Sequence, residues 1–92
     1  MENNNDTDQI AQIAITLSEW LEKVDKVEEA LESLKQAEQI YEYNYSVVDK
    51  RTCKVKRNIS LLYLKANRYD EALEELKEVE VSLQYSDNTL GT

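Results

Sequence analysis

Neither proline nor glycine interrupts this chain before its second-last residue. The 92 residues include no Pro and a single Gly, Gly91. Because Pro and Gly are the residues that most often end or kink helices, the pattern of apolar side chains decides the secondary structure. Apolar residues recur at steps of three and four, the spacing of one helix face, and no stretch alternates as a β-strand does. The pattern predicts four helices, near residues 8–24, 27–45, 49–66 and 69–85.

Each predicted helix carries one stripe of apolar residues, and we expect these stripes to meet in the core. In the two outer helices the stripes are Ile10, Ile13, Ala14, Leu17, Leu21 and Val24, and Tyr69, Ala72, Leu73, Leu76, Val79 and Leu83. In the two inner helices they are Val27, Ala30, Leu31, Leu34, Ala37 and Tyr41, and Val55, Ile59, Leu62, Tyr63 and Ala66. The sequence therefore predicts an all-α fold.

The connections between the predicted helices are short. Asp25-Lys26 joins the first pair and Asn67-Arg68 joins the second. Such short connections make consecutive helices antiparallel neighbours. The middle junction, near residues 45–46, allows two interpretations: a helix start capped by Asn44 or Ser46, or a bend within one long helix.

One domain of two helical hairpins follows from this pattern. The hairpins occupy residues 8–45 and 49–85, which together form the unit 8–85. Polar tails are expected at residues 1–7 and 86–92. A chain of this length buries a thin core.

The residue types that are missing exclude several functions. The chain has no His and one Cys, Cys53, so an internal disulfide and the usual zinc and iron sites are excluded. Glycine-rich phosphate loops are excluded as well. We therefore expect no cofactor and no metal. No apolar run is long enough to span a membrane, and the acidic, polar start is unlike a signal peptide, so we expect no membrane partner and a cytoplasmic location.

Charge is spread unevenly along the chain. The net charge is −8, and residues 1–46 carry all of it, with eleven acids and three bases, whereas residues 47–92 carry eight of each. Five bases fall in the stretch KRTCKVKR, residues 50–57. Because an acidic chain repels a phosphate backbone, nucleic acid is not the expected partner.

The chain repeats itself at a spacing of 42 residues. KVEEALESLKQAE (26–38) aligns with RYDEALEELKEVE (68–80), and seven of ten positions in 29–38 are identical. Shared composition of two Glu-, Leu- and Lys-rich helices is the simpler explanation. However, Ala30 and Ala72 occupy equivalent places after the short turns, where small side chains let two helices approach closely. A helix pair repeated at a fixed spacing of this length indicates a helical solenoid.

The residues at the repeated positions follow a known pattern. In the first repeat they are Leu17, Ser18, Leu21, Ala30, Leu34 and Ala37, and in the second they are Ile59, Ser60, Tyr63, Tyr69, Asp70, Glu71, Ala72, Leu76 and Val79. This pattern resembles the tetratricopeptide repeat (TPR) family over roughly residues 10–85. The stretch YLKANRYDEAL (63–73) is similar to the turn between the two helices of a TPR.

The resemblance implies a TPR-like α-solenoid fragment, with two stacked antiparallel hairpins that bind protein or peptide. The longer spacing is similar to that of kinesin light chains and nephrocystin-type proteins, which implies a ciliary, cytoskeletal or transport role. The sequence departs from the family at the turn Gly (Asp25 and Asn67 here) and at the closing Pro (Glu42 and Gln84). The large residue early in each first helix is also replaced, by Ala14 or Lys56.

The basic stretch forms the candidate partner-binding surface. Lys50, Lys54, Arg57 and Leu61 advance by three and four along the third predicted helix and so share a face, flanked by Asn58 and Lys65. The TPR resemblance implies that this face lines a concave groove and that Asn58 bonds the ligand backbone. The equivalent positions in the first repeat, Ile15 and Glu19, are not basic, so the family's clamp for C-terminal carboxylates is incomplete. We predict that an acidic segment binds to Lys50, Lys54, Arg57, Asn58, Leu61, Leu64, Lys65 and Ile15.

Two other interpretations of the basic stretch stay open. It is also typical of a nuclear-import or nucleic-acid signal. Its cations could instead neutralise the acidic first half of the chain, Glu19 and Glu22 especially.

Enzymatic chemistry is not expected. Pairs such as Glu28/Glu32, Glu71/Glu75 and Glu74/Glu78 lie four residues apart on helices, the arrangement of an ordinary solvated face. Cys53 lies among cations, which is the setting of a reactive thiol, but no His is present to activate it.

The sequence therefore predicts a non-catalytic adaptor that mediates protein–protein contact. The alternative is a structural subunit packed within a larger assembly. Two repeats are fewer than the three usually needed for stability, and the last helix carries Val79, Val81 and Leu83, which is more apolar than a terminal cap needs. We therefore expect self-association, packing on a larger partner, or membership of a longer array.

Overall fold

The computed structural model describes the backbone of residues 4–91 and the side chains of residues 6–84. Four helices make up the fold: α1 (Asn4–Lys23), α2 (Val27–Asn44), α3 (Lys50–Lys65) and α4 (Tyr69–Gly91). No strand occurs within residues 4–91. The predicted all-α class and the number of helices are confirmed.

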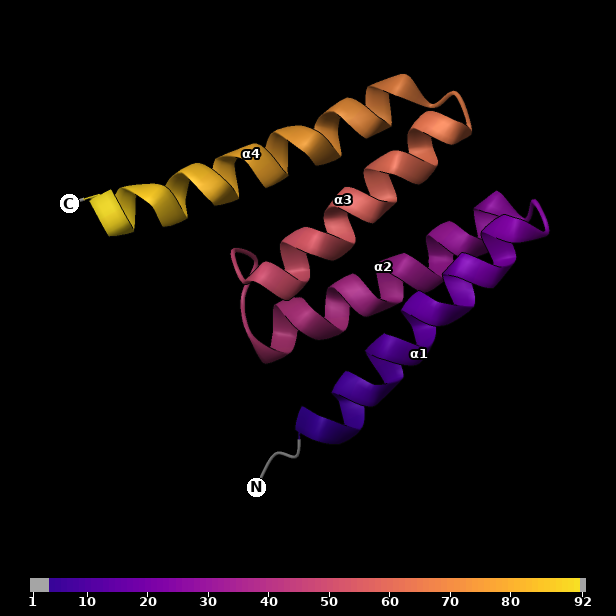
Figure 1. The fold of residues 1–92 in the computed structure, drawn as a ribbon, viewed down its shortest axis with the longest axis horizontal. Coiled ribbons are helices and arrows are strands. Elements are labelled where there is room, and N and C mark those ends of the chain that lie inside the picture. The colour runs from indigo at the N-terminus through magenta and orange to yellow at the C-terminus, as the bar shows by residue number, and fades with distance from the viewer. Residues whose placement is uncertain (1–3, 92) are drawn as a thin grey trace.

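The helices form two antiparallel hairpins placed side by side (Figure 1). Helix α1 packs on α2, α3 packs on α4, and the hairpins meet through α2 and α3. Both tight turns lie at one end of the molecule, and the longer link between α2 and α3 lies at the other (Figure 1). The molecule is flat, with extents of 45 × 36 × 14 Å. Helices α1 and α4 therefore form its two outer edges.

The two tight turns have the same backbone structure. Asp25 and Asn67 adopt left-handed conformations, with φ of 68° and 63°. In the first turn the amide of Lys26 donates to the carbonyl of Leu21 at 2.8 Å, and in the second the amide of Arg68 donates to the carbonyl of Tyr63 at 2.8 Å. These bonds satisfy carbonyls at the helix C-terminus in the manner of a Schellman motif.

The left-handed residues occupy the positions where the TPR resemblance places a turn Gly. Asp and Asn are the residues that best tolerate this conformation after Gly. Because Asp25 and Asn67 are 42 residues apart, the repeat seen in the sequence is present in the backbone as well.

The link between the hairpins differs from the expected cap. Asp49 is the N-cap of α3, and its carboxylate accepts a hydrogen bond from the amide of Arg51 at 2.8 Å. The predicted caps, Asn44 and Ser46, were wrong because their polar groups are used elsewhere. The side-chain amide of Asn44 donates to Thr7 and Asp8 of α1, and the hydroxyl of Ser46 accepts from the amide of Val48 at 3.3 Å, before α3 begins.

The outer helices are longer than the apolar pattern predicts. Helix α1 begins at Asn4 and α4 continues to Gly91, so residues 4–7 and 86–91 of the expected tails are helical. The apolar stripe marks only the packed part of a helix, and no Pro or internal Gly ends either helix earlier. In Figure 1 the C-terminal part of α4 extends beyond the start of α3.

The core within each hairpin is built from small side chains. Ala11, Ala14 and Ser18 of α1 are buried where this helix packs on α2, which contributes Ala30 and Ala37. Small side chains let the two helix axes approach closely. The larger core residues gather around α2 and α3: Leu31, Leu34, Tyr41, Val55, Ile59, Leu62 and Tyr63.

The prediction that all the large apolar residues of the outer helices lie in the core was wrong. The exposed ones are Ile10, Ile13, Leu17 and Val24 of α1, and Tyr69, Leu73, Leu76 and Leu83 of α4. Each outer helix has two apolar stripes, and the stripe of smaller residues is the one that packs within the hairpin. The other stripe has no neighbour at the edge of the molecule. None of the helices, over the described residues, has the length and apolar character required to cross a bilayer.

Candidate functional site

A groove runs between α1 and α3, and we call it the α1–α3 groove. Its main cavity has a volume of about 400 Å³ and is lined by Gln12, Ile15, Thr16, Glu19, Tyr41, Arg51, Lys54, Val55 and Asn58. A second hollow of about 250 Å³ continues it and is lined by Ser18, Glu19, Glu22, Leu34, Asn58, Leu61 and Leu62. Glu19 and Asn58 line both hollows, so the two form one surface with α2 as its floor.

The structure divides the predicted binding residues into two groups. Ile15, Lys54, Asn58 and Leu61 line the groove. Lys65 of the same predicted face is exposed and forms an ion pair with Glu22 of α1 at 3.0 Å. The remaining predicted residues are exposed and do not line the groove: Lys50, Arg57 and Leu64.

Helical geometry explains the division. Lys50, Arg57 and Leu64 are seven residues apart, so they form one line along α3. Lys54 and Leu61 form a neighbouring line, turned toward α1. The predicted face was wider than the groove that the structure forms.

Charge differs between the two walls of the groove. The α1 wall carries Glu19 and Glu22, and the α3 wall carries Arg51 and Lys54. Arg51 bonds the Asp49 carboxylate at 2.8 Å and lies over the Tyr45 ring, 3.8 Å from its centroid. Lys54 forms no ion pair with any of the side chains of residues 6–84, so its ammonium group is available to a ligand.

Several groove residues were missed by the sequence reasoning. Gln12 and Thr16 stand with Ile15 and Glu19 on one face of α1, where a step of three back from Ile15 leads to Gln12 and a step of four from Gln12 leads to Thr16. Arg51 and Tyr41 gave no comparable signal, because their positions depend on how the hairpins meet.

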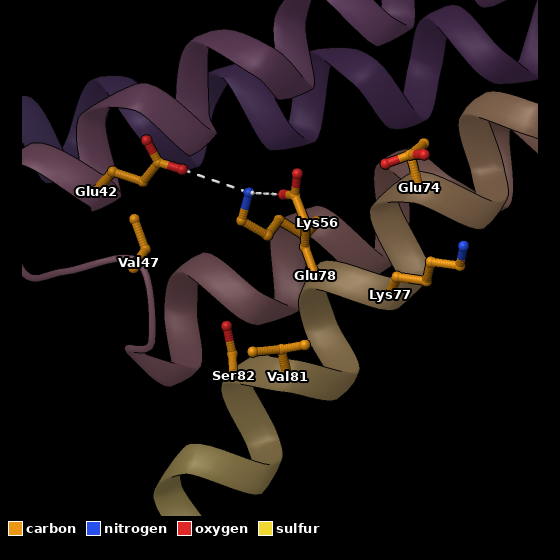
Figure 2. A pocket seen from close by; sticks show the side chains of 8 residues that line it. All are labelled: Glu42, Val47, Lys56, Glu74, Lys77, Glu78, Val81 and Ser82. Atoms are coloured by element: carbon orange, nitrogen blue, oxygen red, sulfur yellow. Dashed lines mark hydrogen bonds and ion pairs between the residues drawn. The ribbon is translucent and has the colours of Figure 1, made fainter.

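The neutralisation interpretation of the basic stretch named Glu19 and Glu22, but in the described residues neither pairs with residues 50–57, and Glu22 pairs with Lys65 instead. Lys56 of the stretch is neutralised by other acids. Lys56 is buried, and its ammonium donates to Glu38 of α2 and, at 2.9 Å, to Glu78 of α4. Glu42 lies 3.4 Å from the same nitrogen. Figure 2 shows Lys56 between Glu42 and Glu78. These three residues line a cavity of about 430 Å³ together with Val47 and Val81.

The carboxylates determine the protonation state of Lys56. Burial alone lowers the pKa of a lysine. The hydrogen bonds to Glu38 and Glu78 outweigh burial here and raise the pKa of Lys56 above its ordinary value of 10.5. Lys56 therefore stays charged and holds α2, α3 and α4 together.

Glu38, Glu75 and Glu78 are the one group of acids in the described residues with the spacing of a metal site, with ligand atoms within 4.8 Å of one another. The Lys56 ammonium already bonds Glu38 and Glu78, which makes this group an ion-pair network. One oxygen of Glu75 is buried without a hydrogen-bond partner in the described part of the chain. Burial, followed by the charge of Glu38, raises the pKa of Glu75 above its ordinary value of 4.5.

In comparisons with known proteins, no family model matched the chain, and neither the curated proteins nor the solved structures gave a significant match. The TPR resemblance stays a prediction based on the residues given above.

Proposed function

We propose that this chain is a non-catalytic protein–protein interaction module that binds an extended segment of a partner protein in the α1–α3 groove. The observation that carries the proposal is the unpaired ammonium of Lys54 beside the half-buried amide of Asn58. Ile15 and Leu61 add apolar surface to the same groove. An amide with donors and an acceptor suits a peptide backbone, and a free cation suits an acidic side chain.

The charges of the groove favour a particular kind of segment. Lys50 and Arg57 lie beside the groove, and neither forms an ion pair with the described side chains, so both add positive potential near Lys54. Glu19 and Glu22 on the opposite wall repel acids. The segment that fits best has an acidic residue near Lys54 and polar or apolar residues near Glu19.

Residue content supports a function without catalysis. The chain has no His, and its one thiol, Cys53, is buried. The charged groups of the Lys56 network are bonded to one another, so they serve the packing of three helices.

The test is selection from a displayed library of random peptides, followed by fluorescence anisotropy with the selected peptide after synthesis. Lys54→Glu should weaken binding about tenfold or more, equivalent to about 1.4 kcal/mol, and Asn58→Ala should weaken it as well. Binding should fall as salt is added, because charge contributes to it.

Lys50→Glu is the matched control. It makes the same change of charge on the same helix, at an exposed and unpaired residue outside the groove. Equal effects of Lys54→Glu and Lys50→Glu would contradict binding in the groove, and so would the failure to select any peptide.

A further inference from the structure

Two apolar stripes lie uncovered on opposite edges of the molecule. On α1, Ile10, Ile13, Leu17 and Trp20 follow steps of three and four and are 47–66% exposed. On α4, Leu73, Leu76 and Leu83 are 38–54% exposed. We call these sets the α1 stripe and the α4 stripe. Apolar side chains gathered in rows of this kind mark interaction surfaces more often than scattered ones do.

The α1 stripe corresponds, 42 residues on, to a buried stripe of α3. The equivalent residues are Thr52, Val55, Ile59 and Leu62, which are at most 3% exposed. Val55 borders the α1–α3 groove together with Tyr41, and Leu62 borders it together with Leu34. Because Tyr41 and Leu34 belong to α2, this stripe of α3 is the one that packs on the preceding hairpin.

The α4 stripe corresponds in the same way to a buried stripe of α2. Leu31, Leu34 and Tyr41 are the equivalents of Leu73, Leu76 and Leu83, and they are at most 5% exposed. Leu34 and Tyr41 face α3, as described above. The α4 stripe is therefore equivalent to the surface of α2 on which the second hairpin packs.

The surfaces inside the two hairpins do not differ in this way. Residues that pack between the two helices of a hairpin are buried in both hairpins. Each pair of equivalents, 42 residues apart, consists of two buried residues: Ala11 and Cys53, Ala14 and Lys56, Ser18 and Ser60, Ala30 and Ala72, Ala37 and Val79. By contrast, the α1 and α4 stripes are exposed although their equivalents in α3 and α2 are buried between the hairpins. Each copy of the chain thus has one exposed surface equivalent to the α3 side of the α2–α3 contact and one equivalent to the α2 side.

We propose that a second copy of this chain docks head-to-tail, with its α1 stripe on the α4 stripe of the first, in the arrangement by which α3 packs on α2. This contact buries apolar side chains on both sides. Self-association of this kind goes beyond the proposed peptide binding and does not depend on it.

The repeat, and not charge, favours the head-to-tail contact over a contact between two α1 helices. Helix α1 carries four acids and one base, and α4 carries seven acids and one base, so both contacts bring acidic helices together. Only the contact of α1 on α4 repeats the pairing of equivalent stripes that α3 and α2 already make within the chain. Helices α1 and α4, which carry the two stripes, lie at opposite edges of the molecule (Figure 1). The contact is therefore heterologous and leads to a chain of copies or a closed ring.

The test uses two variants, each with one blocked stripe. Ile13→Arg/Leu17→Arg blocks the α1 stripe, and Leu73→Arg/Leu76→Arg blocks the α4 stripe. All four side chains are exposed in the single chain, so circular dichroism should show helix content unchanged. Gln39→Arg/Tyr43→Arg, at exposed residues of α2 outside both stripes, is the matched control.

Sedimentation velocity over a wide range of concentration measures the result. The wild type and the control should associate as concentration rises, and each blocked variant should stay monomeric. An equimolar mixture of the two blocked variants should form a dimer and nothing larger, because one intact stripe remains on each chain.

Added salt should strengthen the association, since it screens the repulsion between acidic chains. A wild type that is monomeric at every concentration overturns the proposal, as does a mixture that does not pair. Dimers of the α4-blocked variant alone show α1–α1 packing, and dimers of the α1-blocked variant alone show α4–α4 packing. Either result overturns it too.

Discussion

Lys54 and Lys56 stand two residues apart on α3 and have opposite surroundings. Lys54 lines the open α1–α3 groove and forms no ion pair with the described side chains. Lys56 is buried beneath α2 and α4, where Glu38, Glu42 and Glu78 surround its ammonium group. One lysine is available to a partner, and the other is used to hold the fold together.

The difference follows from the position of α3 between its neighbours. Successive residues of an α-helix are turned by about 100°, so residues two apart point in nearly opposite directions. One side of α3 meets acidic residues of α2 and α4, and another side stays open toward α1. A run of basic residues in a helix is therefore a mixture of structural and ligand-accessible cations.

Replacement of Lys56 should have the largest effect on stability. Lys56→Met leaves Glu38 and Glu78 without their cation. The variant should lower the free energy of unfolding by about 2–3 kcal/mol, because a charge that stays buried without its partner destabilises the fold. Lys54→Met should change it by less than about 0.5 kcal/mol. Urea denaturation followed by circular dichroism measures both, and equal values for the two variants would contradict the structural role of Lys56.

Alkaline pH should remove the contribution of Lys56 gradually. The pKa of Lys56 is raised in the folded chain, so its stabilising effect is fully present below 10.5, the value of an ordinary lysine, and is lost as pH rises toward the folded value. The difference in unfolding free energy between wild type and Lys56→Met should therefore narrow above pH 10.5. Lys54→Met serves as the control. A difference in unfolding free energy between wild type and Lys56→Met that stays constant above pH 10.5 would contradict the prediction.

Replacement of Glu75 should have the smallest effect, and one of opposite sign. Its carboxylate is partly buried near Glu38, so Glu75→Gln should stabilise the fold by less than about 1 kcal/mol at neutral pH. The pKa of Glu75 is raised, so the unfavourable charge disappears as pH falls toward 4.5, and the gain from Glu75→Gln should disappear with it. Destabilisation by Glu75→Gln at neutral pH would show that this carboxylate has a favourable partner.

The sequence predicted the four helices and both tight turns because the information for them is local. Steps of three and four define a helix face, and Asp25 and Asn67 stand where a left-handed residue is required. The sequence could not show which of two adjacent stripes packs inside a hairpin. Leu17 is exposed and Ser18 is buried, although Leu is the more apolar of the two, because the place of α1 at an edge is decided by the whole fold.

The candidate site was predicted in part, because helix periodicity shows which residues of one helix share a face but not which helices pack together. Lys54, Asn58 and Leu61 lie on one face of α3 and line the groove together, and Ile15 lines it from α1. The role of Lys56 could not be predicted, because its partners Glu38 and Glu78 come from two other helices. Lysine in a core position is stable only when such partners are in place.

The matching turns at Asp25 and Asn67 also set the unit by which this chain can grow. A duplication of 42 residues would place another left-handed turn residue at the equivalent position and add one more hairpin in the same orientation. An insertion of a few residues would rotate every later side chain about its helix axis, so lengthening is tolerated in whole modules and not in fragments of them.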